Sequence, residues 1–250
     1  MDFGLKNRVA LITGAGKGIG RVTALTFAAE GAAVALIDLD GAAAQAVAQE
    51  IRAAGGCAVA QQCDITNADS VNSAVDAVIA ELGRIDVLVN NAGISRDATL
   101  LKMQESDWDL VMDVNMKGTF HCCRAVLPHM KAQKWGRVIN LSSRSIFGNP
   151  GQTSYSASKL AVVGFTRSLS LEQARNGITV NAVAPGFVET EGIRSHKSYA
   201  QLKEVAVSKI PVGFLGDPTD IASTVVFLAS EQARYITGTT VFATGGRFSS

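Results

Sequence analysis

A glycine-rich turn between an apolar run and a helical pattern is the feature that most constrains this chain. Residues 9–12 form a continuous apolar run, which is typical of a buried parallel strand. Residues 13–20, with the sequence TGAGKGIG, follow and lead into an amphipathic helix that extends to about residue 30. Glycines let a backbone turn tightly beside a pyrophosphate, and the helix start offers free N–H groups and a positive dipole end. We therefore expect a dinucleotide site at Gly14, Lys17, Gly18, Ile19 and Gly20.

The alternation of apolar strands and amphipathic helices continues to the end of the chain. Further strands are predicted at 33–37, 57–62, 86–89, 136–141, 178–184 and 239–243, and helices at 41–54, 67–82, 107–131, 153–175, 199–208 and 217–228. Single helices between successive strands indicate a parallel sheet covered on both faces. The predicted fold class is α/β, a Rossmann-type doubly wound parallel sheet of about seven strands. Because no linker or repeat interrupts residues 1–250, we expect one domain, with a mobile substrate loop at about 188–211.

The composition is that of an ordinary globular protein and argues against several classes of function. The 250 residues are 47% hydrophobic and 18% charged, with a net charge of +1. Because acids and bases are interspersed, we expect neither a nucleic-acid nor a membrane partner. The run at 9–12 is too short for a signal peptide or a membrane span, so a cytoplasmic location is expected. The four cysteines and three histidines lack metal-ligand spacing, so no metal site is predicted.

Polar residues follow several of the predicted strands. Asp38 ends the second strand, Asp64 follows the third, and Asn90-Asn91-Ala92-Gly93 follows the fourth. Right-handed crossovers place the carboxyl ends of these strands along one rim, where ligands bind. The Asp38 carboxylate can accept hydrogen bonds from the adenosine ribose and would repel a 2′-phosphate, so it favours NAD over NADP. Lys17 opposes this interpretation, because a cation in the turn could pair with that phosphate, and NADP stays possible.

Tyr155 and Lys159 lie four residues apart at the start of a predicted helix. Residues at this spacing share one helix face, so the phenol and the ammonium are expected side by side. A nearby cation favours the phenolate, which would bring a tyrosine with an ordinary pKa of about 10 closer to neutral pH. The spacing alone is more often that of an exposed helix face. Only the dinucleotide context favours the catalytic interpretation.

Together these motifs resemble those of the short-chain dehydrogenase/reductase family over essentially the whole chain. The matching residues are Thr13-Gly14-xxx-Gly18-x-Gly20, Asn90-Asn91-Ala92-Gly93, Asn115, Ser142/Ser143, Tyr155-xxx-Lys159 and Pro185-Gly186. Among subgroups, the chain is most similar to bacterial 3-oxoacyl-[acyl-carrier-protein] reductases and to NAD-linked secondary-alcohol dehydrogenases. The resemblance also implies a homotetramer or a homodimer, in which the helices at 107–131 and 153–175 pair between subunits.

The resemblance further implies roles for single residues. Tyr155 would exchange the proton of the substrate oxygen, Lys159 would lower the pKa of Tyr155 and hold the nicotinamide ribose, and Asn115 would anchor a proton-relay water. A serine would donate a hydrogen bond to the substrate oxygen. The implied cofactor contacts are Asp64 to the adenine, Asn91 to the ribose region, Val188 and Thr190 to the carboxamide, and Ile65, Ala92, Gly93, Pro185 and Gly186 nearby.

Two adjacent serines compete for the hydrogen-bonding role. Counting back from Tyr155 with the usual family separation selects Ser142, whereas counting along the strand from Gly136 and Asn140 selects Ser143. The second count implies a connecting loop one residue shorter than usual, and a deletion is better tolerated in a loop than in a strand. We therefore prefer Ser143 and keep Ser142 as the alternative.

These features lead to two enzymatic hypotheses. The leading one is an NAD-dependent oxidoreductase that interconverts a secondary alcohol, or a β-hydroxy compound, and its ketone. The alternative is an NADPH-dependent 3-oxoacyl-thioester reductase, favoured by Lys17 and by the subgroup resemblance. A non-catalytic subunit of a hetero-oligomer is disfavoured, because it would have no chemical need for both Tyr155 and Lys159.

Three departures from the family pattern limit the functional assignment, and the last of them concerns the substrate pocket and the subunit interface rather than the chemistry. Asp38 suits NAD, whereas those reductases usually take NADPH, and Leu171 stands where they tend to have a basic residue for the carrier. The tail at 242–247 lacks the acidic or amide residue that usually precedes its paired glycines. Candidates for the small-molecule substrate pocket are Ser95, Phe147, Gln152, Phe187 and the segment 191–210.

Overall fold

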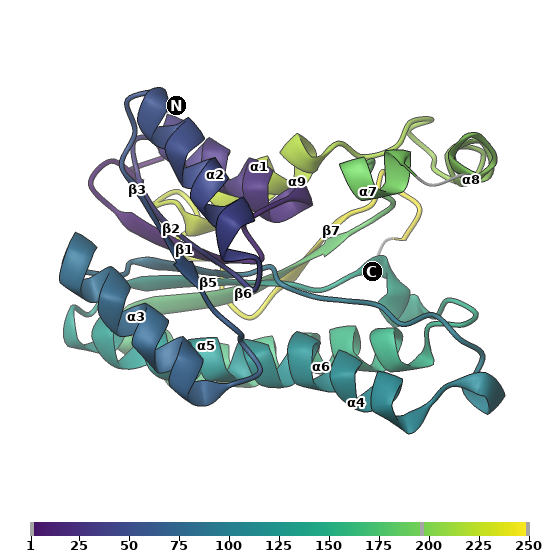
Figure 1. Ribbon diagram of the computed structural model, residues 1–250, viewed down its shortest axis with the longest axis horizontal. Coiled ribbons are helices and arrows are strands. Elements are labelled where there is room, and N and C mark those ends of the chain that lie inside the picture. The colour runs from purple at the N-terminus through teal and green to yellow at the C-terminus, as the bar shows by residue number, and fades with distance from the viewer. Residues whose placement is uncertain (1–2, 196–197, 249–250) are drawn as a thin grey trace.

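The computed structural model, which describes residues 3–195 and 198–248, contains a seven-stranded parallel sheet between two layers of helices (Figure 1). The strands are β1 (Val9–Thr13), β2 (Ala33–Asp38), β3 (Ala58–Gln62), β4 (Val87–Asn90), β5 (Gly136–Leu141), β6 (Ile178–Pro185) and β7 (Thr240–Ala243). The α-helices are α1 (Gly18–Ala29), α2 (Gly41–Ala53), α3 (Ala68–Leu82), α4 (Glu105–Met112), α5 (Gly118–Ala132), α6 (Thr153–Gln173), α7 (Glu191–Arg194), α8 (Tyr199–Val207) and α9 (Pro218–Ala229). The predicted single-domain α/β fold and its strand count are confirmed.

The order of the strands determines where a ligand can bind. The sheet runs β3-β2-β1-β4-β5-β6-β7, with every neighbouring pair parallel. The chain first winds outward from β1 to β3 and then returns to the other side of β1 with β4. The connections after β1 and β4 therefore leave in opposite directions, which opens a crevice at the carboxyl ends of these two strands. The glycine-rich turn and the loop after β4 meet at this switch point.

Each face of the sheet has its own apolar core. Helices α1, α2 and α9 cover one face, with side chains such as Phe27 and Val225 buried against it (Figure 1). Helices α3, α5 and α6 cover the other face, where Met130 and Leu169 are buried together with both Cys122 and Cys123. Burial of one such large side chain contributes roughly 1.5–3 kcal/mol, so the two cores hold the strand ends firmly in place. No helix within the described ranges is long and apolar enough to span a bilayer.

The stretch predicted to be helical at 107–131 is helical throughout, but it is not a uniform α-helix. The chain forms α4, then a π-helical turn at Asp113–Lys117, and then α5. In the π-turn the N–H of Gly118 donates to the carbonyl of Asp113, five residues earlier. Asn115 lies inside this wider turn and is buried, with its side chain bonded to Ile94 and Ser158. These tertiary bonds stabilise an irregular turn that apolar periodicity does not reveal.

Candidate active site

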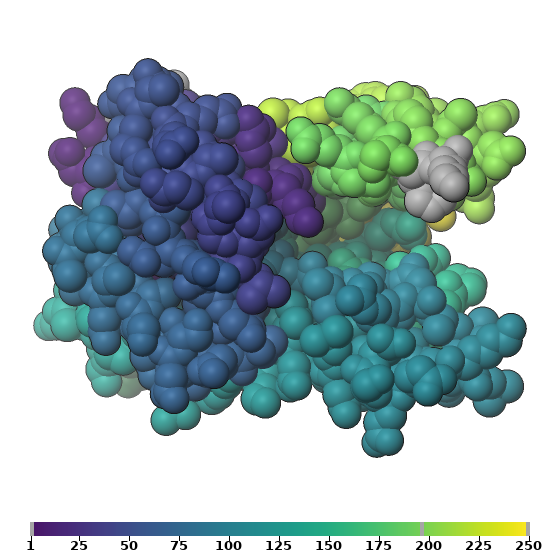
Figure 2. Space-filling model, viewed as in Figure 1, coloured from purple at the N-terminus to yellow at the C-terminus, as the bar shows by residue number. Residues whose placement is uncertain are grey.

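A pocket of about 700 Å³ lies at the carboxyl rim, at the switch point between β1 and β4. In Figure 2 the molecule is hollowed between the green segment that carries α7 and α8 and the teal segment below it. The predicted residues that line the pocket are Gly14, Lys17, Ile19, Asp38, Asp64, Ile65, Asn91, Ala92, Gly93, Ser142, Ser143, Tyr155, Lys159, Pro185, Gly186, Val188 and Thr190. Of the predicted site residues, all of which are described, Gly18, Gly20 and Asn115 do not line it.

Asn91 joins the glycine-rich turn to the loop after β4. Its side-chain amide donates to the carbonyl oxygens of Thr13, at 2.9 Å, and Gly14, at 3.0 Å. In return, Oγ1 of Thr13 accepts from the backbone N–H groups of Asn91 and Ala92. Gly20 is needed because a Cβ there would lie 2.1 Å from the carbonyl oxygen of Gly14. Among the described residues none caps the start of α1 with its side chain, so its N–H groups can serve an anionic ligand.

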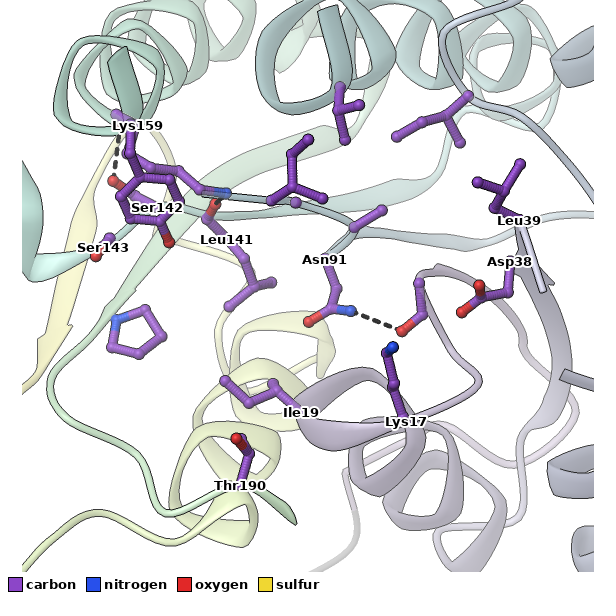
Figure 3. Close-up of a pocket in the computed structure, with 18 of the residues that line it drawn as sticks. Lys17, Ile19, Asp38, Leu39, Asn91, Leu141, Ser142, Ser143, Lys159 and Thr190 are labelled. Carbon is purple, nitrogen blue, oxygen red and sulfur yellow. Dashed lines mark hydrogen bonds between the residues drawn. The ribbon is translucent and has the colours of Figure 1, made fainter. Parts of the chain in front are cut away.

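Asp38 lies at one end of the pocket, where β2 ends. Its Oδ2 accepts from the N–H of Gly16 at 2.9 Å, and its Oδ1 accepts from the N–H of Asp40 at 3.0 Å. Lys17 and Leu39 border the same end, and both are exposed. Figure 3 shows Lys17, Asp38 and Leu39 at this end of the pocket and Ser142, Ser143 and Lys159 at the other, with Asn91 between them. The pocket is therefore elongated, as a dinucleotide requires.

The two serines at the end of β5 have different environments. Ser142 is buried, and its hydroxyl donates to the carbonyl oxygen of Lys159 at 2.9 Å (Figure 3). Ser143 forms a side-chain hydrogen bond with Tyr155, and its Oγ also accepts from the N–H of Ser145 at 3.1 Å. Ser142 therefore fastens β5 to α6, whereas Ser143 brings a second hydroxyl to the phenol in the pocket. This contact agrees with the preference for Ser143 over Ser142, which stays a prediction.

The electrostatics of Tyr155 differ from the expectation for a simple Tyr–Lys pair. Burial is the main effect and raises the pKa of Tyr155, the hydrogen bond with Ser143 lowers it, and the charge of Asp97 raises it further. Lys159 Nζ lies 5.7 Å from the centre of the phenol ring and donates to the carbonyl oxygen of Leu141 at 2.8 Å. Burial lowers the pKa of Lys159 to about 8. The Tyr155 pKa is therefore raised rather than lowered as expected, because burial is the largest effect on the phenol.

Asn115 is buried outside the pocket lining, next to the end of the pocket that holds Lys159. Its Oδ1 accepts from the N–H of Ile94 at 2.8 Å, and its Nδ2 donates to the carbonyl of Ile94 and to Oγ of Ser158. Gly93 lies between Asn115 and Lys159, since a Cβ there would lie 3.1 Å from Asn115 Oδ1 and 3.0 Å from Lys159 Nζ. Asn115 thus ties the loop after β4 to α6, and glycine keeps the space beside Lys159 open.

Comparison with known proteins agrees with this geometry. A family model described as enoyl-(acyl carrier protein) reductase matches residues 14–247. The chain is 45% identical, over 98% of both chains, to (2S)-[(R)-hydroxy(phenyl)methyl]succinyl-CoA dehydrogenase subunit BbsD of Thauera aromatica. It is 44% identical to 3-oxoacyl-[acyl-carrier-protein] reductase FabG of Thermotoga maritima, over 97% of this chain and 98% of the relative. The chain belongs to the short-chain dehydrogenase/reductase family.

The structural comparison leads to the same family. The crystal structure of gox2181 matches with a TM-score of 0.93 and 36% identity, over 97% of this chain and 96% of that chain. This short-chain dehydrogenase/reductase is therefore an oxidoreductase that acts on hydroxyl or keto groups. Ser158 also supports the site, although no sequence signal singles it out: its hydroxyl accepts from Asn115 and donates to the carbonyl of Tyr155. Thr13 belongs to the matching motif, but the motif does not predict the two backbone N–H groups that its hydroxyl accepts from. These hydrogen bonds join segments that are far apart in the sequence, Thr13 to Asn91 and Ser158 to Asn115, so residue spacing does not predict them.

Of the predicted substrate residues, Ile193 in the segment 191–210 lines the pocket, whereas Ser95, Phe147, Gln152 and Phe187 do not. Gln152 donates to Asp97 at 2.9 Å and Ser95 contacts the same carboxylate. Phe147 stacks on Phe248, and Phe187 packs in a small apolar cluster with Ile210 and Leu215. Within the segment 191–210, residues 196 and 197 lie outside the described residues. The assignment of these side chains to a substrate pocket in this short-chain dehydrogenase/reductase, and the mobility of the 188–211 segment, stay predictions.

Proposed function

We propose that this protein is an NAD(H)-linked oxidoreductase that interconverts a 3-oxoacyl thioester and the corresponding 3-hydroxyacyl thioester. The hydroxyl groups of Ser143 and Tyr155, bonded to each other inside the pocket beside Lys159, are the observation that carries the proposal. The names of two relatives, a dehydrogenase of a hydroxyl-bearing succinyl-CoA and a 3-oxoacyl-[acyl-carrier-protein] reductase, support a thioester substrate more than a simple secondary alcohol. The proposal thus takes its substrate class from the alternative hypothesis and its cofactor from the leading one.

Each polar group in the pocket has a separate task in this proposal. Because the pKa of Tyr155 is raised by burial, its phenol is protonated at neutral pH and can donate a proton to a substrate carbonyl oxygen. The Ser143 hydroxyl can donate a hydrogen bond to the same oxygen as negative charge develops there. A bound nicotinamide ring supplies the hydride chemistry. In the oxidative direction Tyr155 must first lose its proton, so that direction is expected to become faster as the pH rises.

The residues present fit a nicotinamide dinucleotide. A close-packed glycine turn and the uncapped start of α1 suit a pyrophosphate, and Gly20 has no room for a side chain. At the adenosine end, the Asp38 carboxylate opposes a 2′-phosphate, and exposed Leu39 beside it offers no positive charge. Lys17 is the nearby cation that could favour NADP. We weigh Asp38 more heavily because its carboxylate is held in place by two backbone N–H groups.

Coenzyme A is the carrier that the surface of α6 favours. Leu171 is 82% exposed at the position where the resemblance leads us to expect a basic residue for an acyl-carrier protein. An apolar side chain there cannot attract an acidic carrier, whereas a coenzyme A thioester would not depend on it. We therefore propose acyl-CoA rather than protein-bound acyl groups as the substrate form.

The experiment compares acetoacetyl-CoA with simple ketones, using NADH and NADPH separately. We expect a kcat/KM for acetoacetyl-CoA at least about tenfold above that for 2-butanone, and tighter binding of NADH than of NADPH. Tyr155→Phe should retain NADH binding and lose turnover by a factor of about 10² or more, the contribution typical of general acid catalysis. Full turnover by Tyr155→Phe would remove the phenol from the mechanism. A preference for 2-butanone would overturn the thioester, and tighter NADPH binding would overturn the NAD assignment.

A further inference from the structure

Two arginines converge on one aromatic ring near the end of the chain. The guanidinium carbon of Arg144 lies 5.8 Å from the centre of the Phe248 ring, and that of Arg247 lies 5.2 Å from it. The same ring stacks on Phe147, with the centres 5.2 Å apart and the planes inclined by 6°. Phe147 in turn contacts Phe242, in β7, at 5.3 Å. These ring contacts hold the C-terminal segment against the loop after β5 and orient both planar guanidinium groups.

The arginine pair borders the catalytic end of the pocket. Arg144 directly follows Ser143, and its charge acts on Tyr155. The segment that carries Arg247 begins at β7, where the carbonyl of Ala243 accepts from the N–H of Gly186 at 2.8 Å. Gly186 itself lines the pocket. The described residues after β7 reach the loop that follows β5, where Phe248 stacks on Phe147. Neither arginine lines the pocket itself, but Arg144 adjoins the lining residue Ser143, and Arg247 follows the strand whose Ala243 is bonded to the lining residue Gly186.

These two cations have no acidic partner in the described structure. Neither Arg144 nor Arg247 forms an ion pair with a carboxylate within residues 3–195 and 198–248, whereas Arg8, Arg21 and Arg84 all do. Partial burial, followed by repulsion from Arg247, lowers the pKa of Arg144. Arginine nevertheless stays charged at neutral pH. Two like charges that are partly buried together are unfavourable, and a bound anion would remove both the repulsion and the lack of a partner.

We propose that Arg144 and Arg247 together bind an anionic oxygen group of the substrate, a carboxylate or a phosphate, at the Tyr155 end of the pocket. A guanidinium group presents paired N–H donors that match the oxygens of either anion. The inference rests on the proposed function, since it names the substrates of the same site: keto compounds with a negative group beyond the reacting carbonyl. Phe147 and Phe248 would cover an apolar part of such a substrate.

The test measures a ratio of affinities, so that general damage to the site does not affect its outcome. The enzyme is loaded with its nicotinamide cofactor, and calorimetry measures binding of acetoacetate, levulinate and 5-oxohexanoate, each paired with its neutral methyl ester. A second arm compares acetoacetyl-CoA with the phosphate-free N-acetylcysteamine thioester. If the arginines bind a carboxylate, the free acids bind more tightly than their methyl esters in the first arm. If they bind a phosphate, acetoacetyl-CoA binds more tightly than the N-acetylcysteamine thioester in the second. We expect about 10- to 100-fold tighter binding of the anionic member in one arm, the range for hydrogen bonds to a charged group.

Variants then assign the preference to the two arginines. Arg144→Gln and Arg247→Gln should each reduce the ratio to below about threefold, whereas Arg144→Lys and Arg247→Lys, which keep the charge, should retain most of it. Arg234→Gln is the matched control, since Arg234 is exposed and follows α9, near the amino end of β6. Equal affinity for the anionic and neutral members in both arms, or an unchanged ratio in both glutamine variants, overturns the proposal. Calorimetry measures binding without turnover. An inactive enzyme would therefore refute the proposed function, whereas the affinity ratios would still test the arginine site.

Discussion

Asp38 shows how one carboxylate can select a cofactor. Because backbone N–H groups hold both of its oxygens, the negative charge has a fixed position at the adenosine end of the pocket. Asp38→Asn removes the charge and keeps an acceptor oxygen. We expect the ratio of NADPH to NADH affinity to rise about tenfold or more, which corresponds to about 1.4 kcal/mol of removed repulsion. Fluorescence titration with both cofactors measures this ratio.

Asp64→Asn provides the matched control for Asp38. The Asp64 carboxylate borders the same pocket, and its hydrogen bonds within the described residues are local ones from the backbone and side chain of Thr66. The Asp64 change can alter affinity for both cofactors and is expected to leave their ratio unchanged. An unaltered ratio in Asp38→Asn would show that the selecting group lies elsewhere, and Lys17 would then be the first residue to substitute.

Lys159 should destabilise the folded chain at neutral pH. Its folded pKa of about 8 lies below the ordinary value of 10.5 because of burial. Below pH 8 both states carry the charge, and the folded state bears the cost of desolvating it. Between pH 8 and 10.5 the unfolded chain binds more protons, so stability rises with pH. The free energy of unfolding should rise across this window by roughly 3 kcal/mol relative to Lys159→Met, at about 1.4 kcal/mol per pKa unit.

Urea unfolding of both proteins at pH 7.5, 9 and 10 measures this difference. The comparison with Lys159→Met cancels the titration of all other groups, which the two chains share. The variant also loses the hydrogen bond to Leu141, but that loss changes little with pH. If the two stability curves run parallel from pH 7.5 to 10, Lys159 does not have a lowered pKa in the folded protein.

At the scale of elements, the π-turn between α4 and α5 depends on Asn115. Asn115→Leu has a similar volume but leaves the N–H and carbonyl groups of Ile94 and the hydroxyl of Ser158 without this partner. Because the Ile94 groups are part-buried and Ser158 keeps its bond to the carbonyl of Tyr155, we expect a loss of about 1–3 kcal/mol in unfolding free energy, the cost of one unsatisfied polar group. Urea denaturation measures the loss, and kcat should fall as the Gly93 loop moves beside Lys159.

Asn115→Asp is the informative control for this element. It keeps the acceptor for the N–H of Ile94 and removes the donor to the carbonyl of Ile94 and to Ser158, so its stability should lie below that of the wild type and, if the retained bond to the N–H of Ile94 matters, above that of Asn115→Leu. A leucine variant as stable as the wild type would show that the π-turn is maintained by packing of α4 and α5 alone.

The same element illustrates what the sequence predicts and what it does not. The buried strands are readable because continuous apolar runs precede turns, and the rim follows from their parallel order. The π-turn cannot be predicted from the sequence pattern, because it is stabilised by hydrogen bonds from Asn115 to Ile94 and Ser158, which lie on other segments. The choice of Ser143 over Ser142 likewise depends on which hydroxyl meets Tyr155. The direction of the Tyr155 pKa shift requires knowledge of burial, which the four-residue spacing to Lys159 does not contain.

At the scale of the whole molecule, one helical face remains available for assembly. Phe120 on α5 and Leu160 and Leu171 on α6 are 40%, 53% and 82% exposed. We propose that this face pairs between subunits in a homodimer or a homotetramer. Light scattering should then give two or four times the chain mass of 26.1 kDa, and Leu160→Asp should lower the assembled fraction. A wild-type protein that scatters as one chain at micromolar concentration contradicts the proposal.

The two rims of the sheet also differ in what their charged groups do. The carboxyl rim holds the pocket, whereas at the amino rim the fully buried Asp86 accepts from Arg8, Arg84 and the N–H of Val9. These bonds join the start of β1 to the start of β4, the two strands between which the pocket opens at the opposite rim. Asp86→Ala leaves buried donors and two cations without their anion, so we expect a loss of about 3–5 kcal/mol in unfolding free energy.

Turnover should nevertheless persist in Asp86→Ala under conditions where the variant is folded, because Asp86 lies at the rim remote from Tyr155. The control is Glu50→Gln, which breaks an exposed pair with Arg21 and should cost no more than about 1 kcal/mol. Urea unfolding and steady-state kinetics on the same samples separate the two effects. If Asp86→Ala lowered kcat as strongly as it lowers stability, the amino rim would be setting the geometry of the carboxyl rim, and the sheet would transmit strain along β1 and β4.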